Sequence, residues 1–260
     1  MMSVEEFDTL TDKLRDKIIF LYFHLMGEPL LHPHLPRFIQ MAREKGFRTV
    51  LTSNGTLLDR AAELLGALPH KIQLSLHSHE SNEVTGRESL EGYVRKVMAF
   101  AMEASAKGTC VVLRLWNQGG KDEENEAVKR MLEQYVPQPW TERPDGYRLC
   151  PNLYLEYDRK FQWPDAAGEE TEKREVYCKA LIKQIGIHAD GSLVPCCLDH
   201  DGDVVLGNLL TQSLEEILTS PRAVAMLDGF RRHTATERLC QTCESAMVGN
   251  SFRGKARKGG

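Results

Sequence analysis

The sequence predicts an α/β protein, in which a parallel sheet with crossover helices is followed by a small α+β domain. Apolar runs and helix-like segments alternate at least four times before residue 136, as they do where strands are joined by helices. Five of the seven cysteines lie after residue 177, and the polar stretch 164–175 before them is typical of a linker. The expected divisions are a sheet domain at 1–165, a cysteine-rich domain at 166–250 and a disordered basic tail at 251–260.

The elements of the first domain follow from a capping motif and from periodicity. Ser3 and Glu6 form a capping box, which opens a helix that runs to about Asp16. The run KIIFLYFHLM at 17–26 is apolar almost throughout, which predicts a strand buried on both faces. The other expected helices are 33–45, a segment after Asp59, 89–107 and 122–135, and the other strands are 47–53, 71–77, 110–117 and part of 149–164.

The second domain is expected to hold a hairpin and short helices. Asp190-Gly191 is a tight hairpin turn, since glycine adopts the positive φ that such turns need. Ser213 with Glu216 makes a second capping box, and Pro221 suits the first turn of a further helix.

Composition and charge exclude several kinds of partner. The 260 residues carry 33 Lys and Arg against 37 Asp and Glu, and this small excess of acid offers no basic surface for nucleic acid or anionic lipid. No apolar run approaches the roughly 18 residues of a membrane span, and the charged start does not resemble a signal peptide. We therefore expect a cytoplasmic protein with a small partner, no nucleic acid and no membrane.

The cysteine spacing predicts a metal site, because clustered thiols in a reducing compartment are not a disulfide framework. Cys178 comes first, Cys196 follows the Gly191 turn, and Cys240 and Cys243 form a Cys-x-x-Cys pair. Four thiolates suit either tetrahedral zinc or an iron-sulfur cluster, and ligand type alone does not separate the two. Unrelated buried thiols are the third interpretation.

The other cysteines are interpreted as structural. In a regular strand Cys197 points away from the face of Cys196, so Cys197 is a packed thiol rather than the ligand. Cys110 lies inside an apolar strand and is expected in the core.

Polar residues stand at the carboxyl ends of the expected strands, where ligands of α/β folds bind. The turn Gly27-Glu28-Pro29 presents backbone carbonyls and one carboxylate, which suits a cationic group. Ser53 and Asn54 end the next strand.

Two further strands carry polar side chains. Gln73, Ser75 and His77 share one face of their strand, which is expected to look inward. Arg114 lies within a strand, and a mostly buried guanidinium needs an anion, a carboxylate being the natural one. Each of these strand-end and strand residues also has a structural interpretation, as a turn residue, a core hydroxyl or half of an ion pair.

The segments that carry these residues resemble a known family. MSVEEF followed by FHLMGEPLLHPHLPRFIQMAREKGFRTVLTSNGTLL resembles the radical S-adenosylmethionine (radical SAM) superfamily, and GIHADGSLVPCCLDHDGDVVLGNLLTQSLEEIL with CQTC resembles its SPASM or twitch C-terminal extension. The resemblance covers roughly residues 3–116 and 178–246. The chain has only the four cysteines of the shorter twitch form. The resemblance therefore implies one auxiliary 4Fe-4S cluster, rather than zinc, on Cys178, Cys196, Cys240 and Cys243.

The sequence also departs from the family pattern. Family members carry Cys-x-x-x-Cys-x-x-Cys after their first barrel strand, and these 260 residues contain no such triplet. The start corresponds to the helix that follows that motif, so we expect an incomplete (β/α) barrel without the first strand and the catalytic cluster loop. Met26 stands where the motif usually has its first glycine, although Gly27, Glu28 and Pro29 remain.

The resemblance implies positions for S-adenosyl-L-methionine (SAM). Gly27 and Glu28 would meet its amino group, beside Pro29. The other implied contacts are Ser53, Asn54 and Ser75 near the methionyl and ribose groups, and Arg114 at the carboxylate.

Two functions follow as hypotheses. The first is a radical SAM oxidoreductase or maturase, which takes hydrogen from a small-molecule or peptide substrate through a 5′-deoxyadenosyl radical and draws electrons from a reductant such as flavodoxin or ferredoxin. The alternative is a non-catalytic cluster-binding or zinc-binding remnant, or an interaction protein. An in-frame cysteine triplet just upstream of Met1 would favour the enzyme, and an in-frame stop with no other start would favour the remnant.

Overall fold

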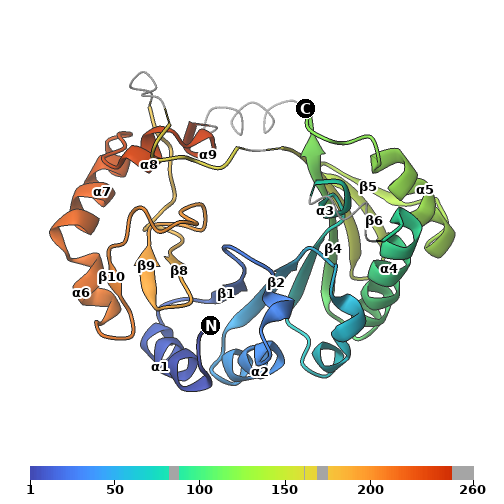
Figure 1. Cartoon of the computed structure of the whole chain (residues 1–260), viewed down its shortest axis with the longest axis horizontal. Coiled ribbons are helices and arrows are strands. Elements are labelled where there is room, and N and C mark those ends of the chain that lie inside the picture. The colour runs from blue at the N-terminus through green and yellow to red at the C-terminus, as the bar shows by residue number, and fades with distance from the viewer. Residues whose placement is uncertain (82–87, 161, 169–174, 248–260) are drawn as a thin grey trace, which may run out of the picture. The chain divides into compact units, whose positions relative to one another are not determined.

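The computed structural model describes residues 1–81, 88–160, 162–168 and 175–247. Its contacts divide the chain into two compact units, which we name the sheet unit, Arg15–Lys160, and the cysteine unit, Met1–Leu14 with Phe161–Gly260 (Figure 1). The expected tail at 251–260 lies outside the described residues.

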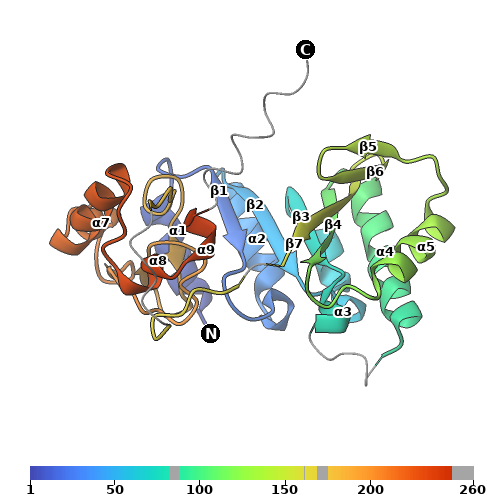
Figure 2. The same cartoon turned by 90° about the horizontal axis from the view of Figure 1, so that it is seen from above.

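The sheet unit is built on one seven-stranded sheet in the order β1-β2-β3-β4-β7-β6-β5. The neighbours from β1 to β7 pair in parallel, and β6 and β5 continue the sheet as antiparallel strands (Figure 2). The strands are β1 (Phe20–Phe23), β2 (Arg48–Ser53), β3 (Lys71–Ser75), β4 (Cys110–Gln118), β5 (Thr141–Arg143), β6 (Gly146–Cys150) and β7 (Leu153–Arg159).

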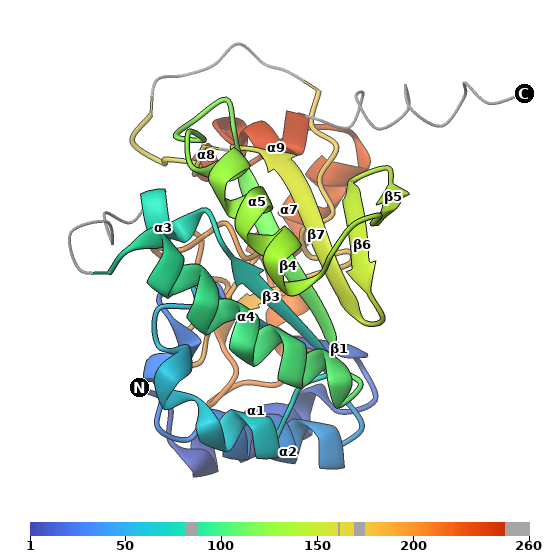
Figure 3. The ribbon, with the colours of Figure 1, turned by 90° about the vertical axis from the view of Figure 1, so that its right-hand side faces the viewer.

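Helices cover one face of this sheet, and the polar side chains lie on the other. Figure 3 shows α4 and α5 in front of β3, β4 and β7. Leu74, Leu113 and Leu155 face these helices and lie in one continuous core, whereas alternation places Gln73 and Arg114 on the opposite face.

No described helix is long and apolar enough to span a membrane. The helices of this unit are α2 (Leu35–Glu44), α3 (Ser78–Ser81), α4 (Leu90–Ala106) and α5 (Asn125–Tyr135).

The first strand is not buried on both faces, so that prediction is wrong. Phe20 and Tyr22 are 48% and 49% exposed, and Phe23 alone of the strand packs against the core. The reason is position, because β1 is the edge strand and pairs, among the described strands, with β2 only. An apolar run is the same in sequence whether its strand is central or at an edge.

Two further elements differ from the expected ones. The helix expected after Asp59 is a pair of 3₁₀ turns, η2 (Leu58–Arg60) and η3 (Ala62–Gly66). The single strand expected within 149–164 is the second strand of an antiparallel pair, because Asn152 takes a positive φ of 62° between β6 and β7.

The cysteine unit holds a small antiparallel sheet, in the order β10-β9-β8. The predicted Asp190-Gly191 turn is confirmed, since Gly191 has φ +85° and joins β8 to β9. The capping box at Ser213 and Glu216 is also present. The elements are α1 (Val4–Leu14), β8 (Gly186–Ile187), β9 (Ser192–Val194), β10 (Gly207–Asn208), α6 (Leu214–Leu218), α7 (Pro221–Arg231), α8 (Arg238–Gln241) and α9 (Glu244–Met247).

Helix α1 belongs by its contacts to the cysteine unit, whereas the sequence had placed residues 1–165 in one domain. The predicted capping box is formed, with Ser3 N donating to Glu6 Oε2 at 2.7 Å and Glu6 N to Ser3 Oγ at 3.1 Å. The physical reason for the different division is Lys13, whose Nζ donates to the carbonyl oxygens of Leu209, Leu210 and Gln212. A contact between residues so far apart leaves no periodic signal.

Replacing Lys13 by methionine should loosen α1. The variant keeps the apolar stem but leaves three carbonyls without their donor, which costs about 1–2 kcal/mol and should speed hydrogen exchange of the α1 amides by about 5–30-fold. The matched control is Lys183→Met, at an exposed position of the same unit. Equal exchange in the two variants would show that the Lys13 contacts contribute nothing.

Candidate functional site

The four cysteines predicted as ligands line one cavity of the cysteine unit. Cys178, Cys196, Cys240 and Cys243 contribute to its wall, and Cys197 does not. No three of the described His, Cys, Asp and Glu side chains converge as they would around a single ion, although the four thiols line the same cavity. The remaining lining residues are apolar or small: Pro164, Ala180, Pro195, Leu198, Leu239 and Ala246.

The thiols reach the cavity from three parts of the unit. Cys240 lies in α8 and Cys243 just before α9, so one tight connection supplies both. Cys178 lies two residues before Ala180, whose N–H donates to the Cys178 sulfur at 3.4 Å. Cys196 follows β9, which ends at Val194. Since Cys196 and Cys197 lie beyond the strand, strand alternation is not what separates them.

Burial makes the free thiolates unfavourable in this cavity. Removal from water raises the pKa of Cys196 to about 12, and the neighbouring thiols Cys178 and Cys243 add to that rise. Burial likewise raises the pKa of Cys178, Cys240 and Cys243. Buried charge is tolerated when it is paired or coordinates a metal. This donor set therefore suits a bound cationic group, whose charge offsets the cost of ionising the sulfurs.

In the sheet unit, Glu28 joins the ends of two strands. Its Oε1 accepts from Leu30 N at 3.0 Å, which caps η1 (Pro29–Leu31), and its Oε2 accepts from Asn54 N at 2.7 Å. Gly27 beside it has φ +85°, a conformation that favours glycine. The turn after β1 is thus tied by one carboxylate to the carboxyl end of β2.

Ser53 and Asn54 both shape the turn that leaves β2. Ser53 is 2% exposed and its hydroxyl accepts from Gly55 N at 3.0 Å. Asn54 Oδ1 accepts from the amide and the hydroxyl of Thr56, at 2.9 and 2.7 Å. Ser75 ends β3, and its carbonyl accepts from the hydroxyl of Tyr93 at 3.1 Å.

Arg114 lies on the polar face of the sheet, apart from the Glu28 contacts. Its guanidinium lies over the ring of Trp116, 3.8 Å from the centroid, and its buried Nε has no hydrogen-bond partner among the described residues. Burial lowers the pKa of Arg114 to about 10, although Glu156, its neighbour in register on β7, acts in the other direction. The expected carboxylate is therefore adjacent in the sheet, but no described ion pair satisfies Nε.

Cys110 was expected in the core, and that prediction is wrong. It is half-buried at the first position of β4, where alternation places it on the same polar face as Arg114. Burial raises the pKa of its thiol.

Sequence reasoning missed Tyr93, which contacts two of the predicted strand ends. Its hydroxyl donates to the carbonyl oxygens of Asn54 and Ser75. The one available signal was its place on the apolar stripe of α4, where a buried tyrosine needs a partner for its hydroxyl.

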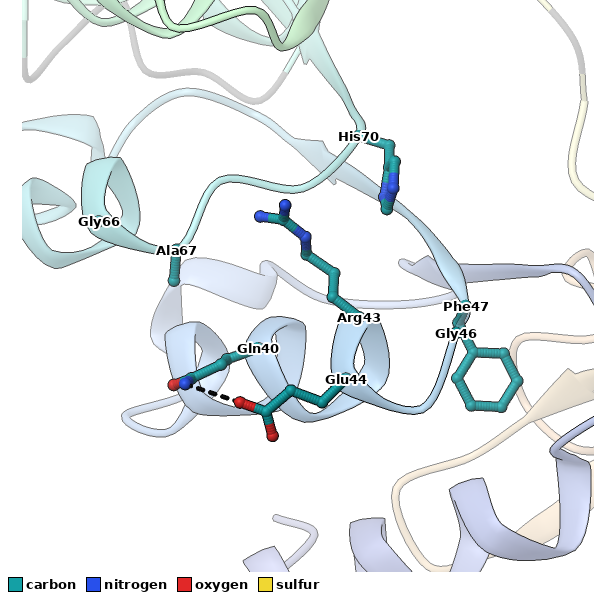
Figure 4. Close-up of a pocket in the computed structure, with 8 residues that line it drawn as sticks. All are labelled: Gln40, Arg43, Glu44, Gly46, Phe47, Gly66, Ala67 and His70. Atoms are coloured by element: carbon teal, nitrogen blue, oxygen red, sulfur yellow. Dashed lines mark hydrogen bonds between the residues drawn. The ribbon is translucent and has the colours of Figure 1, made fainter.

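Besides the cysteine cavity, a hollow lies in the sheet unit at the amino ends of β2 and β3 (Figure 4). The Glu28, Asn54 and Ser75 contacts lie at the other, carboxyl end of these strands. The figure shows His70 and, on α2, the hydrogen bond from Gln40 to Glu44. Arg43 Nη1 donates to Leu68 O at 2.8 Å, so this guanidinium already has a partner. None of the predicted site residues lines it. The lining residues are Gln40, Arg43, Glu44, Gly46, Phe47, Gly66, Ala67 and His70.

Family comparisons identify both parts of the chain. Residues 1–132 match the radical SAM superfamily. Residues 178–244 match SPASM, an iron-sulfur cluster-binding domain. The second match contains all four cysteines that line the cavity.

Individual relatives are more distant. An Fe-coproporphyrin III synthase of Methanosarcina barkeri is 41% identical over 59 residues, which are 23% of this chain and 15% of that protein. The matched segment therefore spans less than a sixth of the curated relative.

Solved structures share the fold. Native anSMEcpe with bound AdoMet has a TM-score of 0.56 at 13% identity, and the match covers 97% of this chain and 86% of that chain. SuiB of Streptococcus suis has a TM-score of 0.56 at 14% identity, with 96% and 68% covered. BtrN in an open conformation has a TM-score of 0.50 at 16% identity, with 94% and 80% covered.

Proposed function

Because the chain belongs to the radical SAM superfamily, we propose that it is an iron-sulfur protein that binds SAM and acts as an oxidoreductase or maturase. One observation carries the proposal: four cysteines from three segments of the SPASM match line a single cavity. The proposed substrate is a small molecule or a peptide, and the proposed electron donor is a flavodoxin or ferredoxin in the cytoplasm.

The proposed ligands of one auxiliary 4Fe-4S cluster are Cys178, Cys196, Cys240 and Cys243. Such a cluster supplies one-electron chemistry at a potential set by burial and by hydrogen bonds to its sulfurs. The chain's own part is to hold four thiolates in an apolar wall and to donate the Ala180 N–H to the sulfur of Cys178. The four proposed ligands, without Cys197, support a domain of the shorter twitch type as part of this proposal.

The proposed SAM site is at the carboxyl ends of β1 to β4. The Glu28 carboxylate, fixed by the amides of Leu30 and Asn54, is a negative charge at the sheet mouth and suits the ammonium of SAM. The buried Nε of Arg114 has no hydrogen-bond partner in the described part of the chain, and this suits the SAM carboxylate. The remaining proposed contacts are Gly27, Pro29, Ser53, Asn54 and Ser75.

The substrate is not carried over from any relative. The Fe-coproporphyrin III synthase is matched over 15% of its length, and the solved structures share at most 16% identity among those compared above. Substrate choice depends on side chains in a site, and these differ between proteins of one fold.

Iron and sulfide content tests the cluster. The 260-residue chain, purified and reconstituted without oxygen, is expected to hold about four irons and four sulfides. A variant with all four ligand cysteines changed to serine is the control for loosely bound iron. Tight stoichiometric zinc without sulfide would contradict the proposal and support a zinc-binding protein instead.

A further inference from the structure

Tyr93 is a buried tyrosine that links the strand ends of the proposed SAM site. It is 0% exposed on α4, and its hydroxyl lies 2.6 Å from the carbonyl oxygen of Asn54 and 3.1 Å from that of Ser75. Ser75 is the last residue of β3, and Asn54 directly follows β2, the neighbouring parallel strand. One hydroxyl therefore holds two strand ends in register.

The turn at Gly55 is shaped to admit this hydroxyl. Gly55 has φ +73°, and a Cβ at this position would lie 3.2 Å from the Tyr93 hydroxyl and 3.0 Å from a methyl group of Val97. A larger residue would push the turn away from α4. The close approach of Tyr93 to the Asn54 carbonyl thus depends on the glycine beside it.

A continuous set of hydrogen bonds results. Glu28 accepts from the amide of Asn54, the carbonyl of Asn54 accepts from Tyr93, and Tyr93 also contacts the carbonyl of Ser75. The set spans the ends of β1, β2 and β3, three of the strands on which the proposed site rests. Burial together with the charges of Glu28 and Glu88 raises the pKa of the Tyr93 phenol.

We propose that Tyr93 is a positioning residue of the SAM site, which sets the distance of Glu28 and Asn54 from Ser75 without touching the cofactor. The inference rests on the proposed function, because it assigns a role within that SAM site. Without the hydroxyl, two carbonyls at adjacent strand ends lose their donor, and the loops that carry the SAM contacts can separate.

The test compares Tyr93→Phe with Thr109→Val in the reconstituted 260-residue chain. Thr109 is a matched control, because its buried hydroxyl also donates to a carbonyl next to β3, that of Pro69 at 3.0 Å, but at the amino end of the strand. Both changes remove one buried hydroxyl, which contacts two carbonyls in Tyr93 and one in Thr109, and both should lower the melting temperature by a few degrees. Equilibrium dialysis with labelled SAM is expected to give about a tenfold higher Kd for Tyr93→Phe and an unchanged Kd for Thr109→Val.

The Kd for SAM is the readout that a merely structural role would not move, and hydrogen exchange tests whether the change is confined to the strand ends. In Tyr93→Phe the amides of Asn54, Gly55 and Thr56 should exchange faster while those of the central strand β4 keep their protection. Equal SAM affinity in Tyr93→Phe and wild type, or faster exchange spread evenly over the sheet, overturns the positioning role. Absence of SAM binding by the wild-type chain overturns the proposed SAM site itself, and the role of Tyr93 with it.

Discussion

Cys196→Ser is expected to lose most of its iron and sulfide on reconstitution, whereas Cys197→Ser should retain a full cluster. The two residues are adjacent, but Cys196 lines the cavity with the other three thiols and Cys197 does not. A serine hydroxyl ionises far less readily than a thiol, and the buried wall disfavours charge further, so the variant supplies three ligands in place of four. The loss should be large, because one iron is then left without a protein ligand.

The pair of variants serves as its own control. Both proteins carry one serine at neighbouring half-buried positions, so a general loss of stability would affect both. Iron, sulfide and the sulfur-to-iron absorption band are measured together. An empty Cys197→Ser protein beside a full Cys196→Ser protein would mean that the ligand is Cys197.

No 5′-deoxyadenosine above background is expected when the reconstituted 260-residue chain is given SAM and dithionite. A cluster held by four cysteines has no open iron to bind SAM, and the 260 residues contain no Cys-x-x-x-Cys-x-x-Cys that would leave one open. The proposed SAM contacts can bind the cofactor without supplying the electron that breaks its carbon–sulfur bond. SAM binding and SAM cleavage are therefore expected to separate in this chain.

Chromatography of the quenched mixture against a no-protein blank measures this prediction. A radical SAM enzyme with its triplet intact is run in parallel, so that a failed reductant is recognised. Formation of 5′-deoxyadenosine in step with protein concentration would contradict the prediction. A negative result combined with a full auxiliary cluster fits an electron-transfer or substrate-binding role for that cluster.

Signals from residues close together in the sequence predict much of the fold correctly. The Ser3–Glu6 and Ser213–Glu216 boxes formed as predicted, because capping depends on residues only three positions apart. The exposure of Phe20 was not predictable, since it depends on β1 lying at the sheet edge. The 3₁₀ turns after Asp59 also differ from the expected helix, as short segments follow their tertiary surroundings more than their own propensity.

In the candidate site, too, features set by nearby residues were predictable, and contacts between residues far apart in the sequence were not. Spacing selected Cys196, yet the argument from strand alternation was wrong, because β9 ends at Val194. Tyr93 was not selected, since a tyrosine on the apolar face of a helix has the same sequence pattern whether its hydroxyl meets water or two strand ends. Its role depends on Asn54 and Ser75, which are brought to it by the sheet.

The contact between Lys13 and the carbonyl of Leu209 has a consequence for synthesis on the ribosome. The two residues are 196 positions apart, and at about 5–20 residues per second the partner of α1 emerges roughly 10–40 s after the helix itself. The sheet unit is continuous in sequence and can fold during that interval. Phe7, Leu10 and Leu14 of α1 are buried in the folded protein. Helix α1 therefore forms its contacts with the carbonyls of Leu209, Leu210 and Gln212 only after most of the 260 residues have been synthesised.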